Sequence, residues 1–231
     1  MLTLIEDTPL SDIPEEIGVG IEALMLPDNN ISNDGNETKE DSPQVNTPCA
    51  IGYTITPSEN GKGRLVCFYM NVLNLTSQAI NQFVMMCDAL LTEEDTLFVH
   101  MNSSLFCEDA ETIYNAIYDC KASKKIASAP YTLNTASFFP VLACDYLVSS
   151  DFMFSHFDTP SLRGGGNIKD AENSLNYDRY RKTRMLEMVN KAGFIPDDAY
   201  EHIIKNQGSF TLYGTKFKEA AIRFNQRTRE K

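Results

Sequence analysis

The sequence predicts an α/β domain with a largely parallel β-sheet, preceded by an acidic N-terminal tail. From residue 62 onward, short runs of β-branched and aromatic residues alternate with longer segments whose apolar residues recur every three or four positions. Strands that alternate with helices in this way are typical of parallel sheets with crossover helices. The acidic residues gather near the start: residues 1–48 contain eleven acidic side chains and one lysine, within a total formal charge of -12.

Three regions follow one another along the chain. Residues 1–26 are expected to form an acidic amphipathic tail, either a partly helical segment or a docking peptide for a protein partner. Residues 27–61 are rich in asparagine, aspartate and proline and have few apolar anchors, so we expect a flexible polar linker. Residues 62–226 form the α/β domain. Neither part offers the basic surface that binds nucleic-acid phosphates, so we expect no nucleic-acid partner.

The first half of the domain is expected to alternate strand and helix. Residues rich in β-formers predict strands at 64–70, 96–101 and 126–129. A helix capped by Thr76 or Ser77 separates the first two strands, and a second helix, with apolar residues between 110 and 120 on one face, separates the next two.

The second half continues the same alternation. A helix is predicted over 135–144, with Pro140 near its first turn, where proline is tolerated. Two short strands and two helices come next, at 146–148, 152–155, 168–190 and from 196 onward. Four apolar residues of this half are expected in the core: Phe138, Phe139, Met153 and Phe154.

The composition indicates where in the cell the protein is expected to act. No apolar run approaches the ~20 residues that span a bilayer, and the N-terminus lacks the basic start and apolar core of a signal peptide. We therefore expect a cytoplasmic protein that does not bind membranes. The six cysteines are scattered without a Cys-x-x-Cys pair, which indicates reduced structural thiols. No metal and no cofactor are expected.

Several short motifs follow one another in a recognisable order. Asn102-Ser-Ser104 ends a strand, Asn134-Thr-Ala-Ser137 opens a helix, and His156 ends a later strand before a glycine-bearing loop and a long helix. On these motifs, residues 62–226 resemble the Clp protease (ClpP) family of the ClpP/crotonase superfamily, in particular members encoded by tailed bacteriophages. The resemblance implies a repeated ββα superhelix with a largely parallel sheet.

The resemblance also implies a catalytic site for amide hydrolysis. Ser137 stands where the family keeps its nucleophile, and His156 stands where it keeps its general base. A serine at a helix N-terminus suits this role, because free N–H groups there favour developing negative charge. The backbone N–H groups of Phe138 and Leu105 are the candidate oxyanion donors. Taken singly, Ser137 is better explained as a helix-start serine, and His156 as a histidine at a strand end.

Two departures from the family pattern bear on activity. The family has a Gly-Gly pair where this chain has Leu105-Phe106, and glycine permits a positive φ that these residues do not tolerate. The family's third catalytic residue is an aspartate, and none occurs at the corresponding 208–212 segment. Asp158, Asn206 and Ser209 are the candidates to orient His156 in its place.

Three functions therefore stay open. The first is a serine peptidase of Clp type that uses Ser137 and His156. The second is a catalytically impaired member of the fold that acts as a binding or regulatory factor, for example as a modulator or inhibitor of a phage head-maturation protease. The third is a crotonase-type acyl-CoA enzyme, suggested only by Leu142-Ala-Cys-Asp145. A homo-oligomer through the 168–190 helix and a partner (an unfoldase or phage protease) at the acidic tail are expected.

Overall fold

The structure is a computed structural model that describes residues 51–58, 62–70, 75–102, 104–129, 132–150, 152–159 and 168–229. The chain divides into two compact units, and all described residues belong to the unit that contains residues 49–231. The predicted tail at 1–26 and the linker up to residue 50 lie outside the described residues. Within these ranges no helix is long and apolar enough to cross a membrane.

The described residues confirm the α/β class and the largely parallel sheet. The larger sheet contains β1 (Gly52–Pro57), β2 (Arg64–Met70), β3 (Thr96–Met101), β4 (Lys124–Ala129) and β6 (Tyr146–Ser149), in the order β1-β2-β3-β4-β6. Strands β2, β3, β4 and β6 are mutually parallel, and only the edge strand β1 is antiparallel to its neighbour. The smaller sheet contains β5 (Thr132–Asn134), β7 (Phe154–Asp158) and β8 (Ser209–Tyr213), with β7 parallel to β5 and antiparallel to β8.

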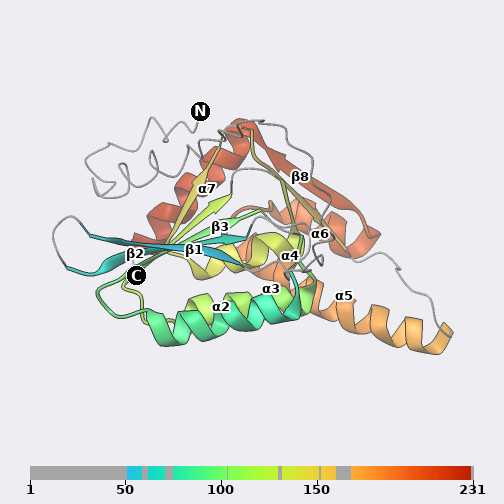
Figure 1. Ribbon diagram of the computed structural model, residues 1–231. Helices are drawn as coiled ribbons and strands as arrows, with labels where there is room; N and C mark the ends of the chain where they lie inside the picture. The colour runs from blue at the N-terminus through green and yellow to red at the C-terminus, as the bar shows by residue number, and fades with distance from the viewer. Residues whose placement is uncertain are drawn as a thin grey trace, which may run out of the picture. The chain divides into compact units, whose positions relative to one another are not determined.

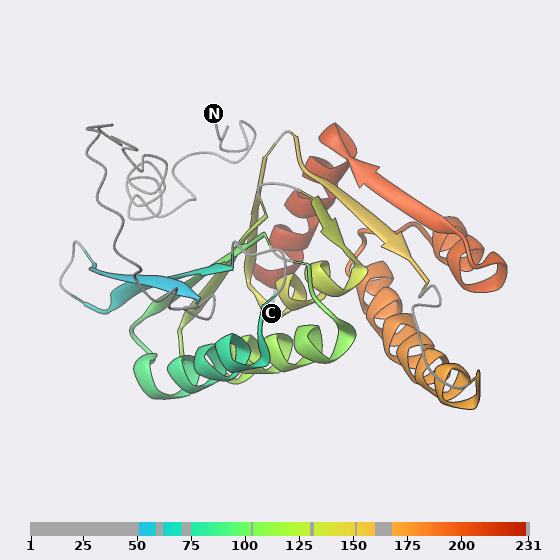
Figure 2. The same ribbon diagram turned by 45° about the vertical axis from the view of Figure 1, so that its right-hand side comes forward.

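The helices cover and connect the two sheets. They are α2 (Ser77–Leu90), α3 (Cys107–Asp119), α4 (Thr135–Phe138), α5 (Ile168–Lys191), α6 (Asp197–Asn206) and α7 (Gly214–Arg229). Helices α2 and α3 lie side by side against one face of the larger sheet (Figure 1). Helix α7 contacts β6 and β8 and so joins the two sheets. Figure 2 shows β7 and β8 side by side, and the N-terminal part of α5 extending away from both sheets.

The local sequence explains why the first helix begins where it does. The Thr76 side chain accepts a hydrogen bond from the Ala79 N–H at 3.2 Å and so caps α2, as its residue type predicts. The buried side chains of α2 include Ile80 and Phe83, on the apolar face predicted from their spacing. Phe83 packs edge-on against Phe68 of β2, which places the core between the sheet and its helices.

Four details differ from the sequence predictions. The linker predicted to reach residue 61 contains β1, because residues 52–57 pair with β2. The helix predicted over 135–144 changes after Phe138 into a 3-10 helix, Phe139–Ala143, because Pro140 has no N–H to continue the α-helical ladder. Phe154 is 41 % exposed rather than part of the core. Strands β5 and β8 and helix α7 were not predicted.

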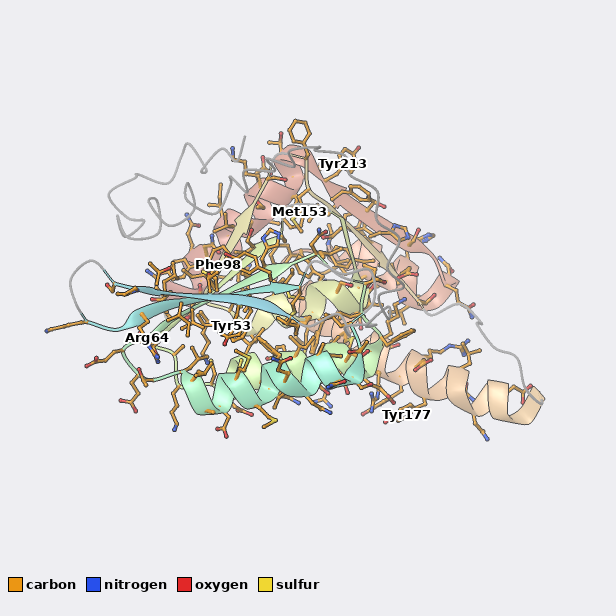
Figure 3. The ribbon with its side chains drawn as sticks, viewed as in Figure 1. Tyr53, Arg64, Phe98, Met153, Tyr177 and Tyr213 are labelled. Atoms are coloured by element: carbon orange, nitrogen blue, oxygen red, sulfur yellow. The ribbon has the colours of Figure 1, made fainter. Side chains whose placement is uncertain are left out.

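A buried carboxylate joins the start of β2 to the start of β3. Asp95 is 1 % exposed, and its two oxygens accept hydrogen bonds from the Arg64 guanidinium at 3.0 and 2.7 Å. The Thr92 N–H and hydroxyl also donate to Asp95, and the Arg64 guanidinium donates to the Leu90 carbonyl at the end of α2. Arg64 is labelled in Figure 3 at the start of its strand. These hydrogen bonds therefore connect the end of α2 to the starts of β2 and β3.

A side chain of α7 forms hydrogen bonds with the edge of β6 that has no neighbouring strand among the described residues. The Asn225 amide of α7 accepts a hydrogen bond from the Leu147 N–H at 2.8 Å and donates one to the Leu147 carbonyl at 3.1 Å. Both bonds imitate the pairing that a further strand would supply. Because Leu147 is fully buried, its backbone groups depend on this amide for their hydrogen bonds.

We expect Asn225→Ala to lower the free energy of unfolding by about 2 kcal/mol, because a buried N–H and a buried carbonyl lose their partners. Urea unfolding followed by circular dichroism measures this change. Gln226→Ala, one position along and exposed, is the matched control and should change stability by less than about 0.5 kcal/mol. Equal effects of the two substitutions would contradict the role given to Asn225.

Candidate active site

Ser137 lies in the first turn of α4, directly after strand β5. Asn134 caps this helix: its side-chain oxygen accepts a hydrogen bond from the Ser137 N–H at 2.8 Å. Asparagine is among the strongest N-cap residues because its side chain satisfies an N–H that has no partner within the helix. Ser137 is itself 1 % exposed. The serine is therefore held firmly at the helix N-terminus, largely shielded from bulk water.

The segment between β3 and α3 approaches this serine. The Leu105 N–H donates a hydrogen bond to the Ser137 Oγ at 3.0 Å, and the Asn134 side-chain amide donates to the Ser104 hydroxyl at 3.3 Å. Among the described non-glycine residues only Gln207 has a positive φ. Leu105 thus presents its N–H without the backbone conformation for which the family uses glycine. Phe106, the next residue, is 68 % exposed and does not fill the core.

His156 lies in the middle of β7, with Asn134 of β5 on one side and Thr211 of β8 on the other. Its Nδ1 is 2.9 Å from the Thr211 hydroxyl oxygen, so that hydroxyl and the ring share a hydrogen bond. The side chain is half-buried. Within the described residues, no hydrogen bond joins His156 to Ser137. In a serine triad the orienting group also engages Nδ1, which leaves Nε2 for the serine.

None of the three residues predicted to orient His156 forms a hydrogen bond with it among the described contacts. The Asp158 carboxylate forms an ion pair with Lys182 of α5 at 2.8 Å, and its N–H donates to the Thr135 hydroxyl at 3.1 Å. Asn206 hydrogen-bonds His202, 3.0 Å away, on its own helix. Ser209 is exposed at the start of β8. The partner of His156 is instead Thr211, two residues further along that strand.

Thr211 is the site residue that the sequence did not reveal. It falls within 208–212, the segment that corresponds to the aspartate of Clp peptidases, but its side chain is a hydroxyl rather than a carboxylate. Thr211 and His156 are 55 residues apart in the chain. Only the pairing of β7 with β8 brings them together, and neither strand's register can be read from its residues alone.

The cysteines that the structure describes do not offer an alternative nucleophile. Burial raises the pKa of the Cys107 thiol to about 11 and raises the pKa of Cys67 and Cys120 above their usual range. A thiol with a raised pKa carries little of the reactive thiolate at neutral pH. The five cysteines within the described ranges are all free thiols. Among the same residues, no group of three or more metal-binding side chains is placed to hold an ion.

A cleft elsewhere on the described part of the chain does not contain these groups. A cleft of about 460 Å³ lies between α2 and α3, with Cys87, Asp88, Asn115 and Cys120 among its lining residues. None of the predicted site residues lines it. Asp145, the last residue of the crotonase-like motif, accepts a hydrogen bond from the Lys125 N–H at 2.9 Å and so supports the sheet at β4.

Together these contacts bring Ser137, the Leu105 N–H and Asn134 close to the His156–Thr211 pair, which lies at the centre of β7 and β8. A hydroxyl beside a backbone N–H donor, near an oriented imidazole, can carry out acyl transfer if the serine and histidine come into contact. Burial of Ser137 limits access to it in this arrangement.

The chain matches no family model and no curated protein.

Proposed function

We propose that the protein is a serine peptidase of Clp type, encoded by a tailed bacteriophage and acting in the host cytoplasm. The observation that carries the proposal is the hydrogen bond from the Leu105 N–H to the Ser137 Oγ at 3.0 Å. Through this contact the Leu105 N–H, the candidate oxyanion donor from a distant segment, lies beside the serine in the Clp-like motif. The alternation of parallel strands and helices, and the short strand β5 that leads into α4, support a ββα superhelix of this family.

In the proposed reaction His156 transfers protons in both acylation and deacylation. The Ser137 Oγ attacks the carbonyl carbon of a peptide bond while His156 Nε2 takes the hydroxyl proton. The N–H groups of Leu105 and Phe138 stabilise the oxygen as it becomes negative, and His156 then gives the proton to the leaving amine. Water, deprotonated by His156, then attacks the acyl-enzyme carbonyl, and His156 returns this proton to the Ser137 Oγ as the bond between Ser137 and the acyl group breaks. The Thr211 hydroxyl orients the imidazole but cannot neutralise its positive charge.

A fluorophosphonate probe tests the nucleophile directly. We expect the probe to label the wild-type protein and not Ser137→Ala, because only an activated serine reacts at an appreciable rate. Ser209→Ala is the matched control: this exposed serine lies two residues from Thr211, and its loss should leave labelling unchanged. Thermal melts of all three proteins show whether they are folded. Labelling that persists in Ser137→Ala, or no labelling of the folded wild type, would overturn the proposal.

A second function is favoured by a different observation. Ser137 is 1 % exposed and its hydroxyl pairs with Leu105 rather than with His156. A serine held in this way suits a member of the fold that has lost catalysis and acts by binding, for example as a modulator or inhibitor of a phage head-maturation protease. Failure of the folded protein to react with the probe is the outcome that would favour it.

The proposed assembly uses α5 and the acidic tail. The N-terminal part of α5 extends from the sheets (Figure 1) and carries two largely exposed tyrosines, Tyr177 and Tyr180. Its C-terminal part is fixed by the Lys182–Asp158 pair and by Arg181, which lies 3.5 Å from carboxylate oxygens of Glu108 and Glu111. These features support a homo-oligomer through 168–190. We further propose that the tail, 1–26, binds an unfoldase or phage protease.

A further inference from the structure

Two exposed aromatic side chains lie on the same face of the smaller sheet as His156. Phe154 precedes His156 by two residues in β7, and Tyr213 follows Thr211 by two residues in β8, so each aromatic side chain shares a face with its site neighbour. Phe154 pairs with Tyr213 across the two strands, as His156 pairs with Thr211. We call the Phe154–Tyr213 pair the aromatic row and the His156–Thr211 pair the histidine row. The two rows lie about 6.7 Å apart along the strands.

The packing of the sheet does not require aromatic residues at these positions. The alternate side chains Ser155, Phe157 and Leu212 face the core and are 0 %, 0 % and 6 % exposed, whereas Phe154 is 41 % and Tyr213 67 % exposed. In the part of the chain that the structure describes, neither exposed ring contacts another aromatic ring. Two neighbouring aromatic side chains that are left open to water beside His156 indicate a binding site.

On the other side of the histidine row, the next cross-strand pair is polar. There Asp158 pairs with Ser209 across β7 and β8, and the Asp158 carboxylate binds Lys182. A peptide that lies over His156 thus meets an apolar row on one side and a polar, charged row on the other. The arrangement favours a ligand with a large apolar side chain on one side of the reacting bond.

We propose that Phe154 and Tyr213 form a subsite for an aromatic or large aliphatic side chain of an extended peptide substrate, an inference that rests on the proposed peptidase function. Successive residues of an extended peptide are about 3.3 Å apart. A side chain two residues from the bond held at Ser137 and His156 therefore reaches the aromatic row. The aromatic row and the histidine row are adjacent on one face of the smaller sheet, so a peptide held at His156 also covers the aromatic row. For this reason we assign a peptide, rather than a second copy of the chain, as the occupant.

The subsite is tested with two fluorogenic peptides that differ at one position, leucine in one and serine in the other. We expect the wild type to prefer the leucine peptide by about tenfold in kcat/KM, the usual size of an apolar side-chain contact. Phe154→Thr with Tyr213→Thr should abolish most of this preference, measured as the ratio of the two kcat/KM values. Threonine is chosen because it keeps strand propensity.

Tyr53→Thr supplies the matched control, since Tyr53 is also an exposed strand tyrosine, at 47 %, but lies on β1 of the other sheet. Figure 3 labels both tyrosines, on different strands. This control should keep the wild-type preference. An unchanged preference in the double variant would overturn the subsite.

A binding measurement separates failure of the subsite from failure of the peptidase proposal. Fluorescence anisotropy of the labelled leucine peptide with Ser137→Ala should show binding that weakens about tenfold when Phe154 and Tyr213 are also replaced. This result would support the subsite even if the wild type never reacts with a serine probe. Binding that does not depend on the two aromatic residues would contradict it. So would a change in oligomeric state, by sedimentation velocity, as the sole effect of the double replacement.

Discussion

Replacing Thr211 with aspartate is expected to raise the rate of Ser137-dependent peptide hydrolysis by about 10²-fold. In serine triads, loss of the orienting carboxylate lowers turnover by about 10⁴-fold. Thr211 already holds the His156 Nδ1 at 2.9 Å, which supplies orientation without charge. A carboxylate at the same place would stabilise the positive imidazole that forms during attack. The kcat for a fluorogenic peptide measures the gain.

Two further substitutions at this position separate charge from geometry. Thr211→Asn has nearly the shape of the aspartate variant but no charge, so it should stay close to wild type. Thr211→Val keeps the branched shape and removes the hydroxyl, and it should lower kcat by about tenfold because the ring loses its hydrogen-bonding partner. Equal rates for the aspartate and asparagine variants would show that Thr211 does not act through His156.

Asp95→Asn is expected to lower the free energy of unfolding by about 2 to 3 kcal/mol, the cost of losing hydrogen bonds to a buried charged group. The side chain accepts hydrogen bonds from both Arg64 and Thr92 while only 1 % exposed, and an amide cannot accept all of them. Urea unfolding at pH 7 measures the change. Asp88→Asn, an exposed aspartate on α2, is the control and should change stability by less than about 0.5 kcal/mol.

The same substitution should remove part of the acid sensitivity. Hydrogen bonds from the Arg64 guanidinium, helped by Thr92, lower the pKa of Asp95 to about 2 against the opposing effect of burial. An aspartate in an unfolded chain has a pKa of about 3.9. The stabilising contribution is thus complete above about pH 4 and is lost as the pH falls towards about 2. The difference between wild type and Asp95→Asn should shrink across that window, and a difference independent of pH would contradict the assignment.

The sequence predicted the first half of the domain well, because each element there carries its own local signal. Thr76 marks the start of α2, and the apolar spacing from Ile80 onward marks its buried face. Strand β1 lacked such a signal: all six of its residues are exposed, and it is held by its pairing with β2 rather than by an apolar pattern. Pro140 is compatible with the first turn of an α-helix, but here it lies at the start of a 3-10 helix.

The candidate site was predictable only in its local parts. Ser137 and His156 stand in short motifs, and the position of Ser137 at a helix start follows from the Asn134 cap. The contacts that these residues make depend on distant segments: Leu105 is 32 residues from Ser137, and Thr211 is 55 residues from His156. Strand pairing and loop approach determine such contacts, and neither leaves a periodic pattern in the sequence.

The amide of Asn225 also has a consequence for how the protein is made. Its hydrogen bonds to Leu147 join residues 78 positions apart, so a ribosome must add dozens of residues after β6 before this contact can form. During that interval the edge strand of a parallel sheet has unpaired N–H and carbonyl groups, which readily recruit other strands. Chains that stop before α7 should therefore associate through β6, and a chaperone that shields exposed strands would act most usefully in this stage of synthesis.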